Sequence, residues 1–144
     1  MRIQDVMQAG DAVVTLTPDA TVGELLALLA RHRIGAVVVR TDATPVAGVV
    51  SERDVVRRLA ETADPAGLLE LTVGEVMTTT VQTCSPDDTT ADLMGVMTRH
   101  RVRHVPVVAG DALAGIVSIG DVVKARIDEL AFERDQLDAY VSGG

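Results

Sequence analysis

GIVSIGD, residues 115–121, repeats the pattern of GVVSERD, residues 48–54, which lies 67 positions earlier in the chain. In each copy a glycine opens a short apolar run, the run ends in a serine, and an aspartate follows three residues later. The apolar run predicts a buried strand, and the two valines after each aspartate indicate a helix. The serine and the aspartate therefore stand where a strand passes into a helix.

This serine and aspartate allow two interpretations. A helix N-terminus offers unpaired N–H groups and a partial positive charge, which suit a phosphate, and the carboxylate can accept hydrogen bonds from a vicinal diol such as a ribose. Alternatively, the serine is only the N-cap and the aspartate a first-turn acid, each stabilising the helix by about 1 kcal/mol. Their occurrence at matching places in two copies favours the binding interpretation.

The two copies belong to a repeat that covers most of the chain. VM at residues 6–7 recurs at 76–77, and RHR at residues 31–33 recurs at 99–101. Buried strands are expected at 13–16, 34–39 and 102–108. Helices should follow the capping-box pattern of Thr21 and Glu24 and its weaker copy, Thr89 and Asp92. Each unit therefore predicts the order strand, helix, strand, strand, helix.

We expect an α/β (α+β) fold with two β-α-β-β-α repeats, at 1–62 and 63–126, and a C-terminal helical extension and tail at 127–144. One unit alone would expose an apolar sheet face, so the two units should pack about a pseudo-two-fold axis. The last helix carries an apolar stripe that either lies back on its own domain or pairs with another subunit. The stripe, with spacings of 4, 3, 7 and 4, consists of Val123, Ile127, Leu130, Leu137 and Val141.

The composition limits the class of protein. The chain of 144 residues fits one compact domain, or two small ones that share a core. A net charge of −8 and the near absence of aromatic residues argue against nucleic-acid binding. There is no signal-peptide pattern and no apolar run of about 18 residues, so a cytoplasmic protein without membrane contact is expected. The single cysteine, Cys84, excludes an internal disulfide and is expected to be buried or half-buried at a strand end.

Two such units, each ending in Gly-h-h-Ser-x-x-Asp (h, apolar), resemble a cystathionine β-synthase (CBS) domain pair, or Bateman module. The lead-ins DVM at 5–7 and EVM at 75–77, and VRHVPVV at 102–108, also fit that family. The resemblance covers residues 1 to about 126. It implies a regulatory module that binds AMP, ADP, ATP, NAD or S-adenosylmethionine in clefts between the repeats. It also implies a homodimer that signals to an unidentified protein partner.

In that family the aspartate holds the ribose hydroxyls, the serine meets the phosphate, and backbone from the lead-in and the other repeat encloses the adenine. Carried over to this chain, the first cleft combines Ser51, Arg53, Asp54, Met77, Thr78, Thr79, Val102, Arg103 and His104. A second, weaker cleft combines Met7, Ala12, Ile34, Gly35, Ala36, Ser118 and Asp121.

The two clefts differ in charge. Arg53 and Arg103, with His104 if it is protonated, bring positive charge to the first, and guanidinium groups are good phosphate partners. Glu52 offsets part of that charge and leaves a preference for polyphosphates open. The second cleft has Gly35 at the place of Arg103 and offers little positive charge. For this cleft we consider weak binding, binding of a nucleoside-like ligand, and no ligand.

Two other functions compete with nucleotide sensing. One is a structural or interaction dimer with degenerate pockets. The other is a metal or redox stress protein, which would need Cys84 or the histidines at 32, 100 and 104 to bind zinc, yet their spacing is not that of a zinc site. No nucleophile elbow or lysine-bearing phosphate loop indicates an enzyme. We therefore predict a non-enzymatic module whose only ligand is a regulatory adenine nucleotide, most directly AMP or ATP in the cleft of Asp54 and Arg103.

Overall fold

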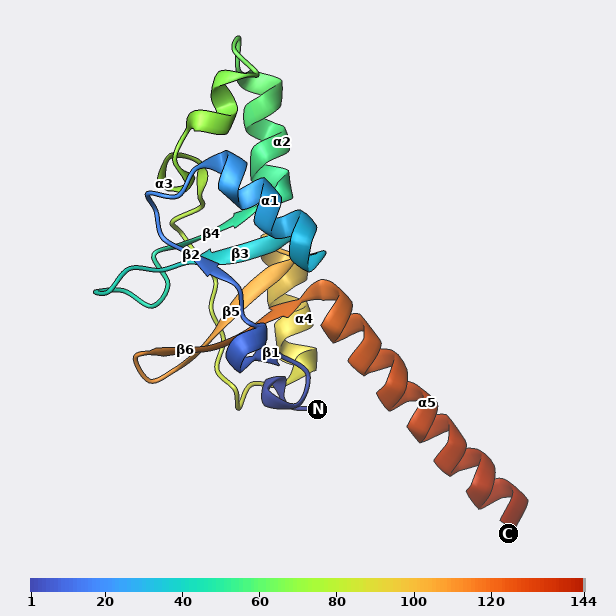
Figure 1. The fold of residues 1–144 in the computed structure, drawn as a ribbon. Helices are drawn as coiled ribbons and strands as arrows, with labels where there is room; N and C mark the ends of the chain where they lie inside the picture. Colours follow the sequence, from blue (N-terminus) through green and yellow to red (C-terminus); the bar gives the residue numbers. More distant parts are fainter. Residues whose placement is uncertain (144) are drawn as a thin grey trace.

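The structure, a computed structural model, describes residues 1–143, with Asp11 described by its backbone alone. Two small α/β halves form the body, and a long C-terminal helix leaves it (Figure 1). The predicted fold class, two α/β repeats with a C-terminal helix, is confirmed. The strands are β1 (Gln8–Ala9), β2 (Thr15–Leu16), β3 (Ala36–Val39), β4 (Gly48–Ser51), β5 (His104–Ala109) and β6 (Ala112–Ser118). The helices are α1 (Val22–His32), α2 (Glu52–Glu61), α3 (Val73–Val76), α4 (Thr90–His100) and α5 (Ile119–Gly143), with short 3-10 helices at Ile3–Asp5, Gly10–Ala12 and Gly67–Glu70.

Each half is built on a three-stranded sheet. In the first, the order is β2-β3-β4, with β2 parallel and β4 antiparallel to β3, and every residue of β3 is buried. In the second, the order is β1-β6-β5, and both pairs are antiparallel. The strands predicted from residues 34 and 102 begin two residues later, because Arg33 and Arg101, both at φ 54°, end the preceding helices in the left-handed conformation.

The two repeats exchange their lead-in segments. β1, from the start of the first repeat, pairs with β6 of the second, and Thr78, from the start of the second, bridges to Val49 in β4 of the first. Ile3 is fully buried in the core of the second half, and Val73 in the core of the first. Each core therefore takes residues from both repeats, which ties them into one body. The boundaries at 62 and 126 stay a prediction.

The exchange explains the glycines that open the duplicated motif. A Cβ at Gly48 would lie 2.6 Å from the sulfur of Met77 and 2.8 Å from the carbonyl oxygen of Thr78. A Cβ at Gly115 would collide with the carbonyl oxygen of Gln8. The lead-in of one repeat thus crosses a strand of the other so closely that only glycine fits without a shift of the backbone.

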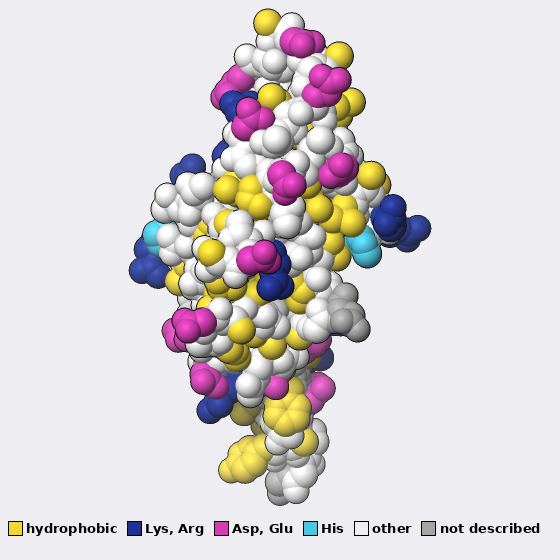
Figure 2. Space-filling model, turned by 60° about the vertical axis from the view of Figure 1, so that its left-hand side comes forward, with side chains coloured by type: hydrophobic (Ala, Val, Ile, Leu, Met, Phe, Trp, Pro, Cys, Tyr) yellow, Lys and Arg dark blue, Asp and Glu magenta, His cyan; other side chains and the backbone are white. Residues whose placement is uncertain are grey.

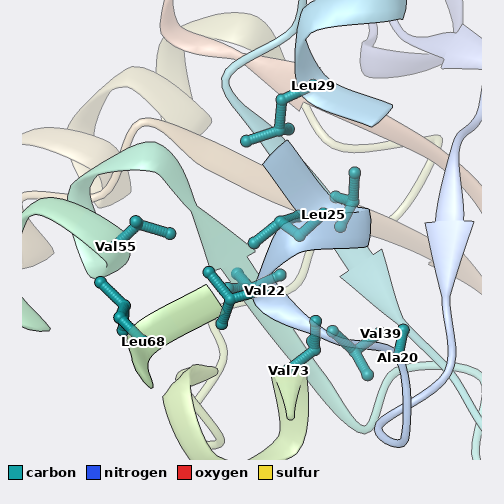
Figure 3. Close-up of a cluster of buried hydrophobic side chains, with 10 residues drawn as sticks. Ala20, Val22, Leu25, Leu29, Val39, Val55, Leu68 and Val73 are labelled. Atoms are coloured by element: carbon teal, nitrogen blue, oxygen red, sulfur yellow. The ribbon is translucent and has the colours of Figure 1, made fainter. Parts of the chain in front are cut away.

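The first core lies between α1, the sheet and the segment around α3 (Figure 3). Val22, Leu25 and Leu29 form one face of α1 and join Val55 of α2 and Val73 of α3 in this cluster. The apolar residues of α1 therefore lie on the face that covers the sheet. The second core is made in the same way from Ile3, Leu93, Met97, Val105, Val107, Val117 and Val122.

The helix caps follow the sequence patterns. Thr21 Oγ1 accepts a hydrogen bond from the N–H of Glu24 at 3.1 Å, and the N–H of Thr21 donates to Glu24 Oε2 at 3.3 Å, which completes the predicted capping box of α1. At α4, Thr89 Oγ1 accepts from the N–H of Asp92 at 3.1 Å. The reciprocal bond to the Asp92 carboxylate is not formed, so the box at α4 stays half complete.

Helix α5 continues far beyond the body (Figure 1). Its first turns pack beside α4, with Val122 and Ala125 buried. The predicted apolar stripe does not lie back on its own domain, since Ile127, Leu137 and Val141 are 61%, 66% and 77% exposed. Within residues 1–143, no helix combines the length and the apolar character needed to span a bilayer.

Candidate functional site

A cavity of about 340 Å³ lies between the two halves, at the start of α2. Its walls come from β4 and α2 of the first half, the segment after α3, and the end of α4 with the starts of β5 and α5 in the second half. Small-molecule sites have volumes of about 300–1,000 Å³. The lining residues are Gly35, Val49, Ser51, Glu52, Arg53, Asp54, Arg57, Thr78, Thr80, Val81, Gln82, Arg101, Val102, Arg103, His104 and Ile119.

Asp54 connects the cap of α2 to the cavity wall. Its Oδ2 accepts hydrogen bonds from the backbone N–H of Ser51 at 2.8 Å and from the Ser51 hydroxyl at 3.1 Å. Its Oδ1 accepts a long hydrogen bond of 3.4 Å from the hydroxyl of Thr78, another lining residue. The capping interpretation is therefore correct for one carboxylate oxygen, whereas the other has lone pairs to offer to a hydroxyl of a ligand.

Four arginines give the cavity its charge: Arg53 and Arg57 on α2, Arg101 at the end of α4, and Arg103 before β5. In the part of the chain that the structure describes, none of the four takes part in an ion pair. The lining carboxylates are Glu52 and Asp54, so positive charge is in excess here although the whole chain carries −8. Unpaired guanidinium groups around one cavity favour a phosphate or carboxylate ligand.

His104 lines the same cavity without adding charge near neutral pH. Burial lowers the pKa of its imidazole below the ordinary value of 6.5 and Arg103 lowers it further, while Glu52 and Asp121 act in the opposite direction. The ring lies close to Gly35, where an added Cβ would be 3.4 Å from His104 Cε1 and 3.3 Å from Glu52 Oε1. A larger residue at position 35 would therefore press on two lining side chains.

The structure brings seven of the nine residues predicted for the first cleft to this cavity: Ser51, Arg53, Asp54, Thr78, Val102, Arg103 and His104. Met77 and Thr79 do not line it. Met77 packs against the first core with its sulfur beside Gly48, and Thr79 is exposed. In an extended segment alternate side chains point to opposite sides, so the neighbours of Thr78 turn away from the cavity.

The residues predicted for the second cleft lie in several environments. Met7 packs against the second core, Ile34 against the first, and Ala36 is buried within β3. Gly35 lines the cavity described above, and Ala12 is exposed. A further cavity of about 340 Å³ is lined by residues 15–17 and 40–42 and contains none of the seven predicted residues.

Ser118 and Asp121 nevertheless repeat the cap geometry of the first cleft. Asp121 Oδ2 accepts from the N–H of Ser118 at 2.9 Å, and Ser118 Oγ accepts from the N–H of Asp121 at 3.2 Å. What differs is the wall, because Gly35 and Gly120 occupy the positions where the first cleft has two arginines. Glycine has no charged side chain, so this place carries less positive charge than the first cleft.

Sequence reasoning missed Arg57 and Arg101. Arg57 follows Arg53 by four residues on one helix, a spacing that places both on the same face and could have revealed it. Arg101 belongs to the second copy of the RHR pattern, at the end of a helix, where basic residues usually complement the helix dipole. Nothing in the local sequence indicates that the residue after this helix lines a cavity formed with the other half.

Cys84 is half-buried, as predicted. Burial raises the pKa of its thiol to about 11, and Asp88 contributes to the increase, so the thiol stays protonated at neutral pH and is a poor nucleophile. Among the residues that the structure describes, no three His, Cys, Asp or Glu side chains are grouped so that they could hold a metal ion.

Comparisons with known proteins agree with this architecture. The CBS domain model matches the chain twice, at residues 3–61 and 73–128. The mitochondrial CBS domain-containing protein CBSX3 of Arabidopsis thaliana is 33% identical over 151 residues, covering 99% of this chain and 72% of that protein. The crystal structure of the CBS-domain containing protein ATU1752 from Agrobacterium tumefaciens is 42% identical, with a TM-score of 0.78 over 88% of this chain and 99% of that one. CBSX2 in complex with AMP is 24% identical and has the same fold, with a TM-score of 0.73 over 88% of this chain and 96% of that one. The chain belongs to the CBS-domain family, in which it forms a tandem pair.

Proposed function

We propose that this CBS pair is a regulatory module that binds an adenosine nucleotide, most directly AMP or ATP, in the cavity between its halves. The observation that carries the proposal is that the Asp54 carboxylate and four arginines, which make no ion pair with any side chain the structure describes, meet at one cavity. The arginines suit the phosphates, and the carboxylate suits the ribose hydroxyls. No chemical step is involved, because the role is to bind.

The cavity offers a place for each part of the ligand. The ribose hydroxyls donate to Asp54 Oδ1 in place of the 3.4 Å bond from Thr78. The phosphate lies at the N-terminus of α2, beside Arg53. The adenine packs against the apolar part of the wall, which contains Val102 and Ile119. The AMP complex of CBSX2, a protein of the same fold, supports a ligand of this class.

Regulation follows from the position of the cavity, because its lining joins segments of both halves. A bound nucleotide bridges α2 of the first half and the α4–β5 turn of the second, and thereby favours one arrangement of the two. A homodimer whose subunit contacts depend on that arrangement would pass the change to a partner protein. The alternative, an interaction module that needs no ligand, is favoured by one observation, the exposed apolar face of α5.

A thermal-shift panel tests the proposal. The purified chain is heated with AMP, ADP, ATP, NAD, S-adenosylmethionine and, as the control without phosphate, adenosine. A ligand present at 100 times its dissociation constant stabilises the folded state by about 2.7 kcal/mol. We expect AMP or ATP to raise the melting temperature more than adenosine does. If none of the six raises it at millimolar concentration, the chain is an interaction module and the nucleotide proposal is wrong.

A further inference from the structure

The part of α5 beyond the body presents an apolar seam with no cover from the described residues of its own chain. Val123 is 42% exposed, and Ile127, Leu130, Leu137 and Val141 are 53% to 77% exposed. Figure 2 shows hydrophobic side chains standing out at the lower end of the molecule, where α5 ends. Together with Arg134 the five apolar residues recur at alternating intervals of four and three residues from 123 to 141, which is the repeat of a coiled-coil seam. At 1.5 Å per residue the seam is about 27 Å long.

This seam is not the face by which α5 contacts the body. Val122 and Ala125 are buried against the second half, whereas Val123, next in the chain to Val122, is exposed. With about 100° between successive helical residues, the seam lies roughly a quarter-turn around the helix from the buried face. The helix can therefore keep its contacts with the body while the seam meets another molecule.

The charges beside the seam indicate which molecule and in which direction. In a parallel pair of α5 helices, Arg134 would face its own copy in the seam, and Glu133 would face Asp138 of the second copy, so both contacts join like charges. In an antiparallel pair, Arg134 packs beside Leu130 of the second copy. Lys124 of each copy contacts Asp138 of the other, so the two-fold axis gives two contacts between opposite charges. The one like-charge contact, between the two Glu133 side chains at the axis, has both Arg134 side chains next to it.

We propose that α5 packs antiparallel against α5 of a second copy of this chain, with residues 123–141 of the two helices overlapping about a two-fold axis near Phe132. Val123 then lies opposite Val141 of the second copy, and Ile127 opposite Leu137 of the second copy. Such an interface is self-complementary, as a two-fold dimer requires. The inference goes beyond the ligand proposal and does not depend on it.

Disulfide trapping tests the direction of pairing. Ile127→Cys and Leu137→Cys are made separately in a Cys84→Ser background of the full chain, oxidised singly and as an equimolar mixture without nucleotide, and analysed on non-reducing gels. Antiparallel packing predicts a disulfide mainly in the mixture, between position 127 of one variant and position 137 of the other. Disulfides formed equally well by each variant alone would show parallel packing and overturn the proposal. So would the absence of any disulfide while circular dichroism shows both variants folded.

Charge reversal gives a second, independent measurement in the trapped mixture. Lys124→Asp turns both Lys–Asp contacts into like-charge pairs and should slow trapping about fivefold or more, and Asp138→Lys should do the same. The double variant, which exchanges the two charges, should restore the wild-type rate only if the helices are antiparallel, because residues 124 and 138 do not meet in a parallel pair. Failure of the double variant to restore trapping would refute the register. The nucleotide thermal shift, measured on the same variants, reports separately on the cavity.

Discussion

Asp54→Ala and Asp121→Ala form a matched pair of substitutions that separates ligand binding from helix capping. Each aspartate accepts a hydrogen bond from the backbone of a serine three residues before it, at 2.8 Å for Asp54 and 2.9 Å for Asp121. Only Asp54 also lines the cavity with the four arginines. Both variants should therefore lose the carboxylate half of the capping box while the serine hydroxyl still caps the helix. Asp54→Ala should also lose the contact with the ribose.

The expected sizes follow from these contacts. Loss of an acid and its hydrogen bond in the first turn of a helix costs about 0.3–1 kcal/mol of the free energy of unfolding, and this cost should appear in both variants. Loss of the hydrogen bonds that a ribose donates to a charged carboxylate costs about 1.5–3 kcal/mol of binding free energy. That loss raises the dissociation constant by about 10- to 150-fold. Asp54→Ala should show both effects, and Asp121→Ala the first alone.

Isothermal titration calorimetry with AMP and ATP measures the dissociation constants, and urea unfolding measures the stability of each variant. The reasoning is refuted if Asp54→Ala binds with the affinity of the wild type. It is also refuted if Asp121→Ala loses affinity to the same degree, because the loss would then come from helix destabilisation and not from the cavity.

Three further predictions follow from the structure. Gly115→Ala should lower the free energy of unfolding, measured by urea denaturation, by about 1–3 kcal/mol, because the added Cβ collides with backbone. Gly95→Ala in α4, where the added Cβ has open space, should instead raise it by about 0.5–1 kcal/mol. The folded state keeps His104 neutral by lowering its pKa, so its contribution to stability is complete above pH 6.5 and is lost as the pH falls below that value. Between pH 7.5 and 5.5 the free energy of unfolding of His104→Gln should therefore fall less than that of the wild type. An equal fall in both proteins would contradict this. Arg57→Gln should weaken ATP binding about fivefold and adenosine binding hardly at all, and Arg31→Gln, outside the cavity, should affect neither when both are titrated calorimetrically.

The limits of prediction are clearest at the two clefts, which share one duplicated motif. Both carry the serine and aspartate, and both form the same cap in the structure. The difference in charge was visible in the sequence, since Gly35 stands at the place of Arg103. The contribution of Arg101 was not visible, because it depends on how the end of α4 meets the other half. The neutral state of His104 was equally hidden, since burial sets it.

Local order was determined by the sequence by itself. The capping boxes at Thr21 and Ser51, the duplicated glycine-to-aspartate motif and the apolar faces of α1 and α4 each depend on residues within one or two turns of one another, so their hydrogen bonds and periodicity can be recognised directly in the chain. The family resemblance rests on the order and duplication of these local signals, and for that reason it held.

Only the tertiary structure decided which segments meet. The exchange of lead-ins, which places Ile3 in the second core and Val73 in the first, joins residues far apart in the chain, and many pairings of the same apolar segments would satisfy the local pattern equally well. The direction in which α5 leaves the body was also left open. An apolar stripe indicates that one face of a helix is buried, but not whether its own domain or another subunit covers that face. Tertiary packing selects one answer in each case, since shape and close contact, unlike periodicity, are properties of the assembled body.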